Sequence, residues 1–305
     1  MEGVLVLNKP KGFTSHDCVF KVRKLLRTKK VGHTGTLDPD VTGVLPICIG
    51  RATKIVEYLT AATKTYEGDV TIGFSTTTED ASGELVEKKA VTSPITKEDI
   101  LGVLQSLTGT IEQTPPMYSA VKINGKKLYE YARAGIEVER PTRAITIHEL
   151  TLLDGRQVFE GETISFRFRV TCSKGTYVRT LAVMIGEKLG YPAHMSDLIR
   201  TASGPFTLDD CLTFEEIEEY VEKHEIQQYL LPIEKALFHL PKLQINDKLA
   251  EKVKNGAVLP KPEDMDIDIE QGPFLMIDST GTCLAIYEKH PQKEGLIKPT
   301  KVLAI

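Results

Sequence analysis

The chain of 305 residues is 41% hydrophobic and 26% charged, a composition typical of a globular protein with one large domain, or one large and one small. Its longest stretch without Asp, Glu, Lys or Arg covers the twelve residues 100–111, too few to cross a bilayer as a helix. These features exclude a disordered chain and a helical membrane protein. The first residues lack the basic-then-apolar order of a signal peptide, so we expect a cytoplasmic location.

The formal net charge of -4 is unevenly distributed along the chain. Residues 21–30 hold six basic side chains and no acidic one, whereas acidic residues dominate 209–270. A basic run is typical of a solvated helix face, but it also suits a surface that replaces counterions on a polyanion such as RNA. Both interpretations are open on charge alone.

The cysteines are too far apart for a local metal or redox motif. Neighbouring cysteines are at least thirty residues apart, and their number is odd: Cys18, Cys48, Cys172, Cys211 and Cys283. This spacing excludes a zinc knuckle and a CxxC pair. We expect buried, apolar thiols in a reducing compartment.

The first elements in chain order are a strand, a turn and a helix. Residues 3–7 are apolar enough for a strand, and the string NKPKG at 8–12 ends it, because proline lacks an amide donor and glycine accepts left-handed backbone. Ser15 can cap a helix that runs to about Leu26. Its apolar residues share one face, which leaves the basic residues on the other sides.

Alternation and capping residues predict the elements that follow. Residues 64–74 and 164–171 alternate in polarity and indicate strands. Thr96 and Thr213 begin capping-box patterns, and Gly109 ends the first of the two helices. A hairpin pattern at 274–287 indicates a small β-rich unit. We therefore expect two domains, residues 1–235 and 240–305.

Residues 32–46, with the string GHTGTLDPDVTGVLP, hold three glycines and two prolines, so they form a shaped loop rather than a helix or strand. The GxxxxGK[ST] and GxGxxG spacings are missing, which excludes the phosphate loops of nucleotide-binding proteins. Pro39 disfavours helical backbone at Asp38. A substrate could approach this carboxylate closely.

With NKPKG before it, this loop resembles the nucleophile region of the TruB family of tRNA pseudouridine synthases. Similar blocks follow in the same order: KTY at 64–66, PPMYSA at 115–120 with Lys122, GKKLYEYAR at 125–133 and CSKGTYVRT at 172–180. The match runs to about Arg200. Met195 and Ile199 depart from the family pattern.

The resemblance implies an α+β fold, in which a mixed, mainly antiparallel central sheet is flanked by helices, and a small C-terminal β-rich domain like the RNA-binding PUA domain. It implies an isomerase that converts uridine 55 in the T loop of tRNA to pseudouridine without metal or cofactor. The T arm would bind the large domain and the acceptor end the small one, where acidic residues at 263–270 interrupt the basic surface. We expect a monomer, because a folded RNA needs an open cleft.

The resemblance also implies catalytic roles for three residues. Asp38 would be the nucleophile, and Arg179 the guanidinium that positions it and lowers its pKa. Tyr66 would stack on the target base and help to remove the proton after the ring is rejoined through carbon. Whether Asp38 attacks the sugar or the uracil ring is left open.

Other residues are implied in holding the RNA. His33 would fill the place of the extruded uridine, and Tyr177 and Leu198 would line the uracil pocket. A further set of basic residues would meet backbone phosphates: Lys9, Lys122, Lys126, Lys127 and Arg133.

Two alternative interpretations are open. The basic surfaces also suit a noncatalytic tRNA-folding chaperone or RNA-binding module. A glycoside-cleaving enzyme would need a second carboxyl group roughly 5–10 Å from Asp38, and Asp40 is the nearest candidate in the sequence.

Overall fold

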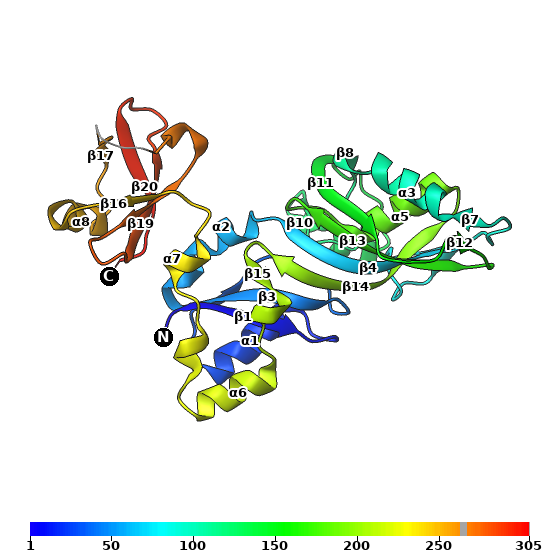
Figure 1. Ribbon diagram of the computed structural model, residues 1–305, viewed down its shortest axis with the longest axis horizontal. Coiled ribbons are helices and arrows are strands. Elements are labelled where there is room, and N and C mark those ends of the chain that lie inside the picture. The colour runs from blue at the N-terminus through cyan, green and yellow to red at the C-terminus, as the bar shows by residue number, and fades with distance from the viewer. Residues whose placement is uncertain (263–266, 305) are drawn as a thin grey trace.

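A long, twisted sheet forms the body of the protein (Figure 1). The computed structural model describes residues 1–262 and 267–304. Strands follow one another in the order β1, β3, β14, β4, β13, β11 and β8, and only β14 and β3 run parallel. The predicted mixed, mainly antiparallel sheet is therefore confirmed. The strand bounds are β1 Gly3–Lys9, β3 Thr42–Ile49, β4 Lys64–Ile72, β8 Gly109–Gln113, β11 Arg143–Leu152, β13 Ile164–Cys172 and β14 Ala193–Ser203.

The cap of helix α1 (Ser15–Leu25) lies one residue earlier than the sequence suggests. Thr14 is the capping residue, and its side chain accepts a hydrogen bond from the amide of Asp17. The prediction that Ser15 caps the helix is wrong, because its buried hydroxyl instead bonds to the backbone of Leu37. Of the basic run, Lys21 pairs with Glu218 at 3.3 Å. Four of the others are exposed: Lys24, Arg27, Lys29 and Lys30.

Both predicted strands form, as β4 and β13, but β13 alone of the two carries the predicted alternation, because Val70, Thr71 and Ile72 of β4 are all buried. Along β13 the aromatic and aliphatic side chains are buried while Ser165 and Arg169 are exposed. Strand β4 ends at Ile72, two residues before the predicted end, because Gly73 adopts a φ of 118°. The chain then turns into a short strand pair, β5 (Phe74–Thr76) with β6 (Leu85–Lys88).

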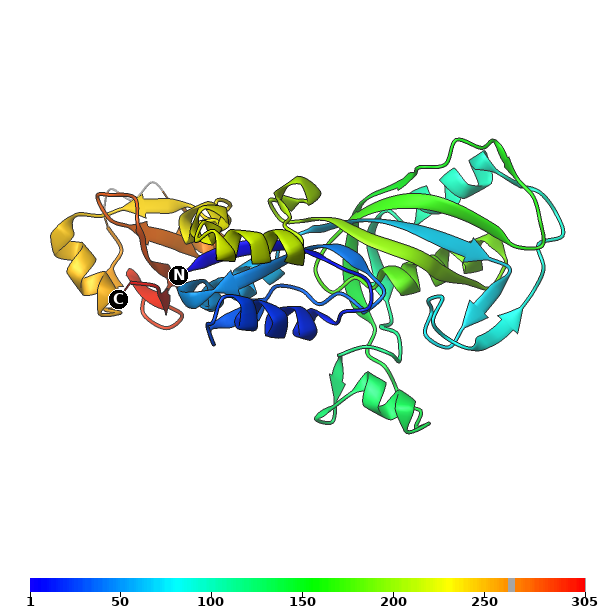
Figure 2. The same cartoon turned by 90° about the horizontal axis from the view of Figure 1, so that it is seen from below.

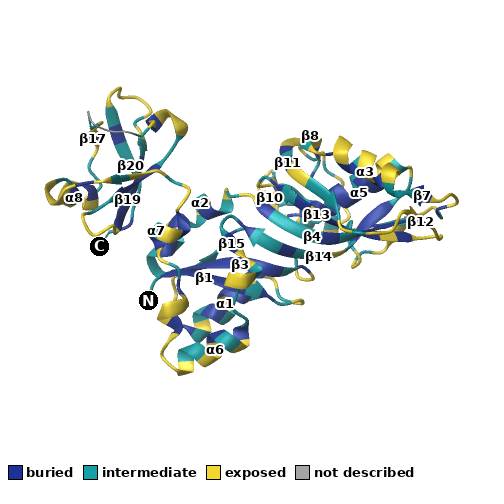
Figure 3. Ribbon diagram, in the orientation of Figure 1, coloured by how far each residue is buried: buried dark blue, intermediate teal, exposed yellow. Residues whose placement is uncertain are grey.

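Helices cover part of the sheet, and strands β1 and β3 are almost fully buried, whereas β8 and β11 keep exposed residues (Figure 3). Helices α3 (Lys97–Ser106) and α5 (Val178–Leu189) pack against each other and the sheet, and α6 (Phe214–Glu222) packs against α1. The capping boxes predicted at Thr96 and Thr213 are both confirmed. Within residues 1–262 and 267–304, every helix is too short or too polar to span a membrane.

A hairpin and a short helix project from the sheet between β8 and β11 (Figure 2). They consist of β9 (Lys122–Ile123), β10 (Lys126–Lys127) and α4 (Leu128–Arg133). The remaining short elements are β2 Val31–His33, β7 Ile95–Thr96, β12 Val158–Phe159, β15 Phe206–Thr207 and helices α2 Val56–Thr60 and α7 Ile233–Ala236.

A second sheet forms at the C-terminal end, in the order β16, β18, β19, β20, β17, with helix α8 beside it. The predicted hairpin is confirmed as β18 paired with β19. The acidic stretch predicted at 263–270 lies partly, at 263–266, outside the described residues. The bounds are β16 Lys242–Gln244, α8 Asp247–Lys254, β17 Leu259–Pro260, β18 Phe274–Ile277, β19 Cys283–Lys289 and β20 Leu296–Val302.

The two sheets are joined by direct contacts as well as by the chain. Arg51 pairs with Glu2 and donates to the carbonyl oxygen of Leu303 at 2.9 Å. The Cys283 amide donates to Glu234 at 2.7 Å. Because buried residues of both parts share one apolar cluster, the C-terminal sheet is held in a defined place. The division at 235–240 remains a prediction.

Substituting alanine for Gly43 is expected to reduce the free energy of unfolding by about 2–4 kcal/mol, from backbone strain and overpacking. Gly43 has a φ of 103°, and a Cβ there would lie 2.2 Å from the carbonyl oxygen of Arg200. Gly190→Ala is the matched control, because its φ is 85° but no atom lies within 4 Å of the added Cβ. Its expected cost is about 1–2 kcal/mol. Urea unfolding measures both, and equal losses would contradict the close approach of β3 and β14.

Candidate active site

The loop between β2 and β3 presents Asp38, and the N-terminal segment fixes the backbone on both sides of it. The Leu37 amide donates to the Ser15 hydroxyl at 2.8 Å, and this hydroxyl donates to the Leu37 carbonyl at 3.2 Å. On the other side, the Pro39 carbonyl accepts from the Gly12 amide at 2.9 Å. The strings NKPKG and GHTGTLDP, separated in the sequence, therefore form one rigid structure.

Lys9 has a different place from the one that the resemblance implies. The residue is 0% exposed, and its Nζ donates to the carbonyls of Pro10, Phe13 and Pro39 at 3.0, 2.5 and 3.0 Å. Burial lowers its pKa. An ammonium enclosed by three carbonyls cannot reach a phosphate, so we correct this assignment: Lys9 ties the N-terminal turn to the Asp38 loop.

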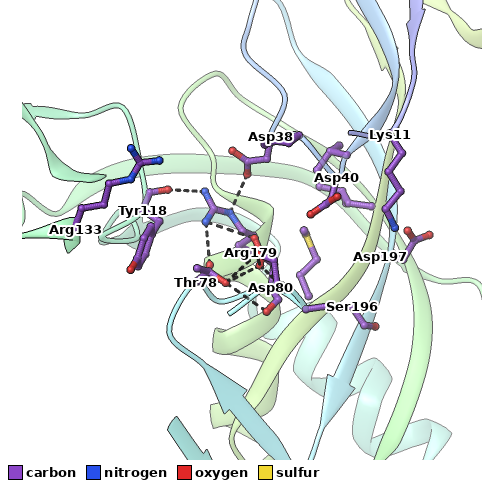
Figure 4. A pocket seen from close by; sticks show the side chains of 16 residues that line it. Lys11, Asp38, Asp40, Thr78, Asp80, Tyr118, Arg133, Arg179, Ser196 and Asp197 are labelled. Atoms are coloured by element: carbon purple, nitrogen blue, oxygen red, sulfur yellow. Dashed lines mark hydrogen bonds and ion pairs between the residues drawn. The ribbon is translucent and has the colours of Figure 1, made fainter. Parts of the chain in front are cut away.

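Arg179 reaches Asp38 from the first turn of α5 (Figure 4). Its Nε lies 3.0 Å from Oδ2 of Asp38, while Nη1 donates to the Thr78 carbonyl at 2.9 Å and Nη2 to the Tyr118 carbonyl at 2.8 Å. The arginine side chain is 6% exposed. With every nitrogen bonded, the guanidinium has one orientation, which points Nε at the carboxylate.

The start of α5 is itself held by a buried glutamine. Gln113, at the end of β8, accepts from the Tyr177 amide at 2.7 Å and donates to the Tyr177 carbonyl at 3.0 Å. Such a two-bond clamp fixes the backbone one residue before the helix. It therefore sets the position of both Tyr177 and Arg179.

The environment of Asp38 shifts the pKa of its carboxyl group in two opposite directions. Although 44% of the side chain is exposed, burial of the group in the cleft raises its pKa above the usual 3.8, the Arg179 charge opposes this, and Asp80 adds to it. The expected lowering by Arg179 is present but is outweighed by the loss of water. A carboxylate with a raised pKa is the more basic and hence more reactive nucleophile, provided that it is ionised.

Two cavities meet at the Asp38–Arg179 pair. The smaller, about 290 Å³, brings together Tyr66, Tyr177 and Leu198, the three residues predicted to hold the target base. The larger, about 460 Å³, is polar and holds Asp40 and Arg133. Asp38, Val41, Arg179 and Leu198 border both. The pair therefore stands at the junction between a pocket that contains two tyrosine rings and a cleft lined by several charged side chains.

The other predicted RNA-binding residues lie further out. His33 is in β2 and lines neither of these two cavities; its Nδ1 is buried without a hydrogen-bond partner, and burial lowers its pKa. Lys122, Lys126 and Lys127 lie on the projecting hairpin, and of the basic residues on that segment Arg133 reaches the larger cavity. The wedge and phosphate roles of these residues stay predictions.

Sequence reasoning missed several side chains that build the site. Asp80 lies 3.8 Å from Nη1 of Arg179 and lines the larger cavity. Lys11 lines that cavity too, and Arg200 lines the smaller one. The chain has 42 acidic residues, and no local sequence pattern distinguishes Asp80 from the others. Lys11 could have been considered, because it lies two residues from Lys9 in the same turn. Among the residues that the structure describes, no three His, Cys, Asp or Glu side chains gather as metal ligands.

Comparison with known proteins identifies the class to which this fold and site belong. Residues 23–178 match the model of the TruB family pseudouridylate synthase N-terminal domain, and residues 179–238 match the tRNA pseudouridylate synthase B C-terminal domain. The protein is thus a pseudouridine synthase, an isomerase. Together these matches cover more than half of the chain, and the chain belongs to the TruB family.

Relatives and solved structures agree with this assignment. The tRNA pseudouridine synthase B of Bacillus thuringiensis (strain Al Hakam) is 66% identical over 304 residues, covering 99% of this chain and 97% of the relative. That of Geobacillus thermodenitrificans is 65% identical, covering 99% of each chain. The crystal structure of a Cbf5-Nop10-Gar1 complex matches with a TM-score of 0.73 and 29% identity, over 99% of this chain and 84% of that one.

Proposed function

We propose that this protein isomerises uridine 55 in the T loop of tRNA to pseudouridine, with Asp38 as the nucleophile. Relatives named tRNA pseudouridine synthase B, at 65–66% identity over nearly the whole length, support tRNA as the substrate. The observation that carries the proposed chemistry is the 3.0 Å contact between Arg179 and an Asp38 carboxylate that is still 44% exposed. A carboxylate that is oriented and accessible can attack an electrophilic carbon.

The smaller cavity suits the extruded uridine. It is walled by the rings of Tyr66 and Tyr177 and by Leu198, and stacking of a base on an aromatic ring contributes roughly 1–3 kcal/mol. Extrusion from the T loop costs a few kcal/mol, so stacking offsets much of it. The base would then lie beside the carboxylate that borders the same cavity.

The chemistry follows from what borders this cavity. Asp38 forms an ester with the sugar or with the ring, the N-glycosidic bond breaks, the uracil rejoins the sugar through its carbon 5, and the ester bond breaks again to free the Asp38 carboxylate. The proton on carbon 5 must then leave, and the hydroxyl of Tyr66 is the group that we assign to take it. Every non-hydrogen atom of the uridine is kept, and the proton lost from carbon 5 is balanced by one that N1 takes up, so the reaction needs neither hydride nor phosphoryl transfer.

The RNA would lie across the cleft and the second sheet. We assign His33 to the place of the extruded base, and the exposed Lys122, Lys126 and Arg133, with Lys127, to backbone phosphates. Lys11, on the wall of the larger cavity, replaces Lys9 in this set. The C-terminal domain, residues 240–305, would act as a PUA-like unit on the acceptor end. A cytoplasmic monomer is the form that we expect to act.

Tritium release from tRNA labelled at carbon 5 of its uridines tests the proposed function. We expect one tritium per tRNA, with pseudouridine mapped to position 55 alone, and none from a transcript that carries cytidine there. Binding without release would support the noncatalytic chaperone instead. Cleavage of a free nucleoside to uracil and sugar, without loss of tritium from carbon 5, would favour the glycoside-cleaving alternative.

A further inference from the structure

A buried guanidinium lies beside Tyr66 and has no part in the chemistry described so far. Arg200 is 1% exposed and stands in β14 directly opposite Tyr66 of β4. Both residues line the smaller cavity. None of the ion pairs found within the described residues includes Arg200. A buried cation without an anionic partner is costly to keep, which calls for a function.

The side chain of Arg200 is held in place by the Asp38 loop and by the strand β3 that follows it. Its Nε donates to the Val44 carbonyl at 2.7 Å, and Nη2 donates to the Gly35 carbonyl at 3.2 Å. Nη1 also lies against this loop, since a Cβ built at Gly35 would be 3.4 Å from it. Two carbonyl dipoles orient the guanidinium but leave its positive charge unpaired.

The last step of the proposed reaction needs a base at this place. The proton on carbon 5 passes to an acceptor, and the electron pair of the C–H bond restores the double bond between carbons 5 and 6 of the uracil. A neutral phenol accepts a proton poorly, whereas a phenolate accepts it well. A nearby positive charge favours the phenolate.

We propose that Arg200 is a positioning residue that stabilises the phenolate form of Tyr66 while Tyr66 takes the proton from carbon 5. The tyrosine becomes a neutral phenol in this step and later returns the proton to water. This inference rests on the proposed function and adds a residue to it. It also links the two catalytic side chains, because Arg200 binds the loop of Asp38 and faces Tyr66.

Among the groups that shift the pKa of Tyr66, Arg200 is the one that lowers it, although burial outweighs Arg200 and leaves the pKa raised. Burial raises the pKa of Tyr66, the Arg200 charge lowers it, and Cys172 of β13 and Asp38 raise it. Lys64 of β4 has a pKa lowered by burial to about 8, and its Nζ is turned to the carbonyls of Thr60 and Ala62 at 2.5 Å each. Arg200 is thus the neighbouring charge that most favours the phenolate form of Tyr66.

The test is the rate of pseudouridine formation in a single turnover, with tRNA that carries hydrogen or deuterium at carbon 5 of uridine 55. We expect the Arg200→Met protein to form pseudouridine about 10²-fold more slowly than the parent. Its rate should rise as the pH rises from about 7 to about 9. Deuterium at carbon 5 should slow the Arg200→Met protein by a larger factor than it slows the parent. A loss of rate that is independent of pH and of deuterium would mean a merely structural role and would overturn the inference.

A double-mutant cycle keeps the inference testable if Arg200→Met is unstable. If Arg200 acts through Tyr66, then Arg200→Lys and Arg200→Met cost far less rate in the Tyr66→Phe protein than in the parent. If the rate losses of the Arg200 and Tyr66 variants simply multiply in the double variant, the coupling between the two residues is refuted. Thermal unfolding of each variant separates folding from chemistry. An inactive parent protein would refute the proposed function, whereas an active parent with uncoupled variants would refute only the role of Arg200.

Discussion

Asp38→Asn is expected to lower the rate of pseudouridine formation in tRNA by at least about 10³-fold, as removal of a catalytic nucleophile does, while the affinity for tRNA stays within a fewfold of the parent. The amide is nearly the same size as the carboxylate but cannot form the ester that the reaction requires. Single-turnover assays of tritium release and filter binding of labelled tRNA measure the two quantities.

Asp40→Asn is the matched control for this prediction. Asp40 lies two residues away in the same loop and lines the larger cavity, but it makes no contact with Arg179 in the ion pairs of the site. We expect a change in rate of no more than a fewfold. An equal loss for Asp38→Asn and Asp40→Asn would support a pair of catalytic carboxyl groups, as in glycoside hydrolysis, and would contradict the single-nucleophile mechanism.

Arg179→Met is the second large effect, with an expected loss in kcat/KM of about 10²-fold or more, because a misplaced reacting group costs about that much. Asp38 loses the group that orients it, and the carbonyls of Thr78 and Tyr118 lose their donors. Two partly buried acceptors without partners should lower the free energy of unfolding by about 1–3 kcal/mol. Steady-state kinetics and urea unfolding measure the two losses.

Arg167→Met separates this effect from the loss of any arginine in the sheet. Arg167 pairs with Glu67 and Asp69, but its side chain is 40% exposed, so such a pair contributes only about 0–1 kcal/mol. We expect activity close to that of the parent. Arg179→Lys should remain impaired, since an ammonium cannot replace a guanidinium that binds three partners in fixed directions. Full activity of Arg179→Lys would show that charge alone suffices.

The sequence was most informative where a short string has one structural meaning. Capping boxes at Thr96 and Thr213 and the alternation of β13 depend on neighbouring residues, so they could be predicted from local patterns. The cap of α1 failed for a reason outside the helix: Ser15 is used by the loop of Asp38. A rule that uses only neighbouring residues cannot predict that Leu37, 22 residues away in the chain, competes for the Ser15 hydroxyl.

Lys9 shows the same limit in the site. A lysine in a turn is normally exposed, and only the folded structure surrounds its Nζ with three carbonyls. Asp80, Gln113 and Arg200 were missed for a related reason, because each acts through a partner that is distant in the sequence: Arg179, Tyr177 and Val44. Their residue types are common, and spacing along the chain carries no sign of these contacts.

The amino-acid sequence by itself determined the family, the mixed α+β class and the strings that supply Asp38, Tyr66 and Arg179, since these depend on residue type and order. The tertiary structure decided that Asp38 and Arg179 meet at 3.0 Å, that two cavities join there and that Arg200 lies opposite Tyr66. The physical reason is that distance, loss of water and the pairing of buried charges arise only when segments far apart in the chain pack together.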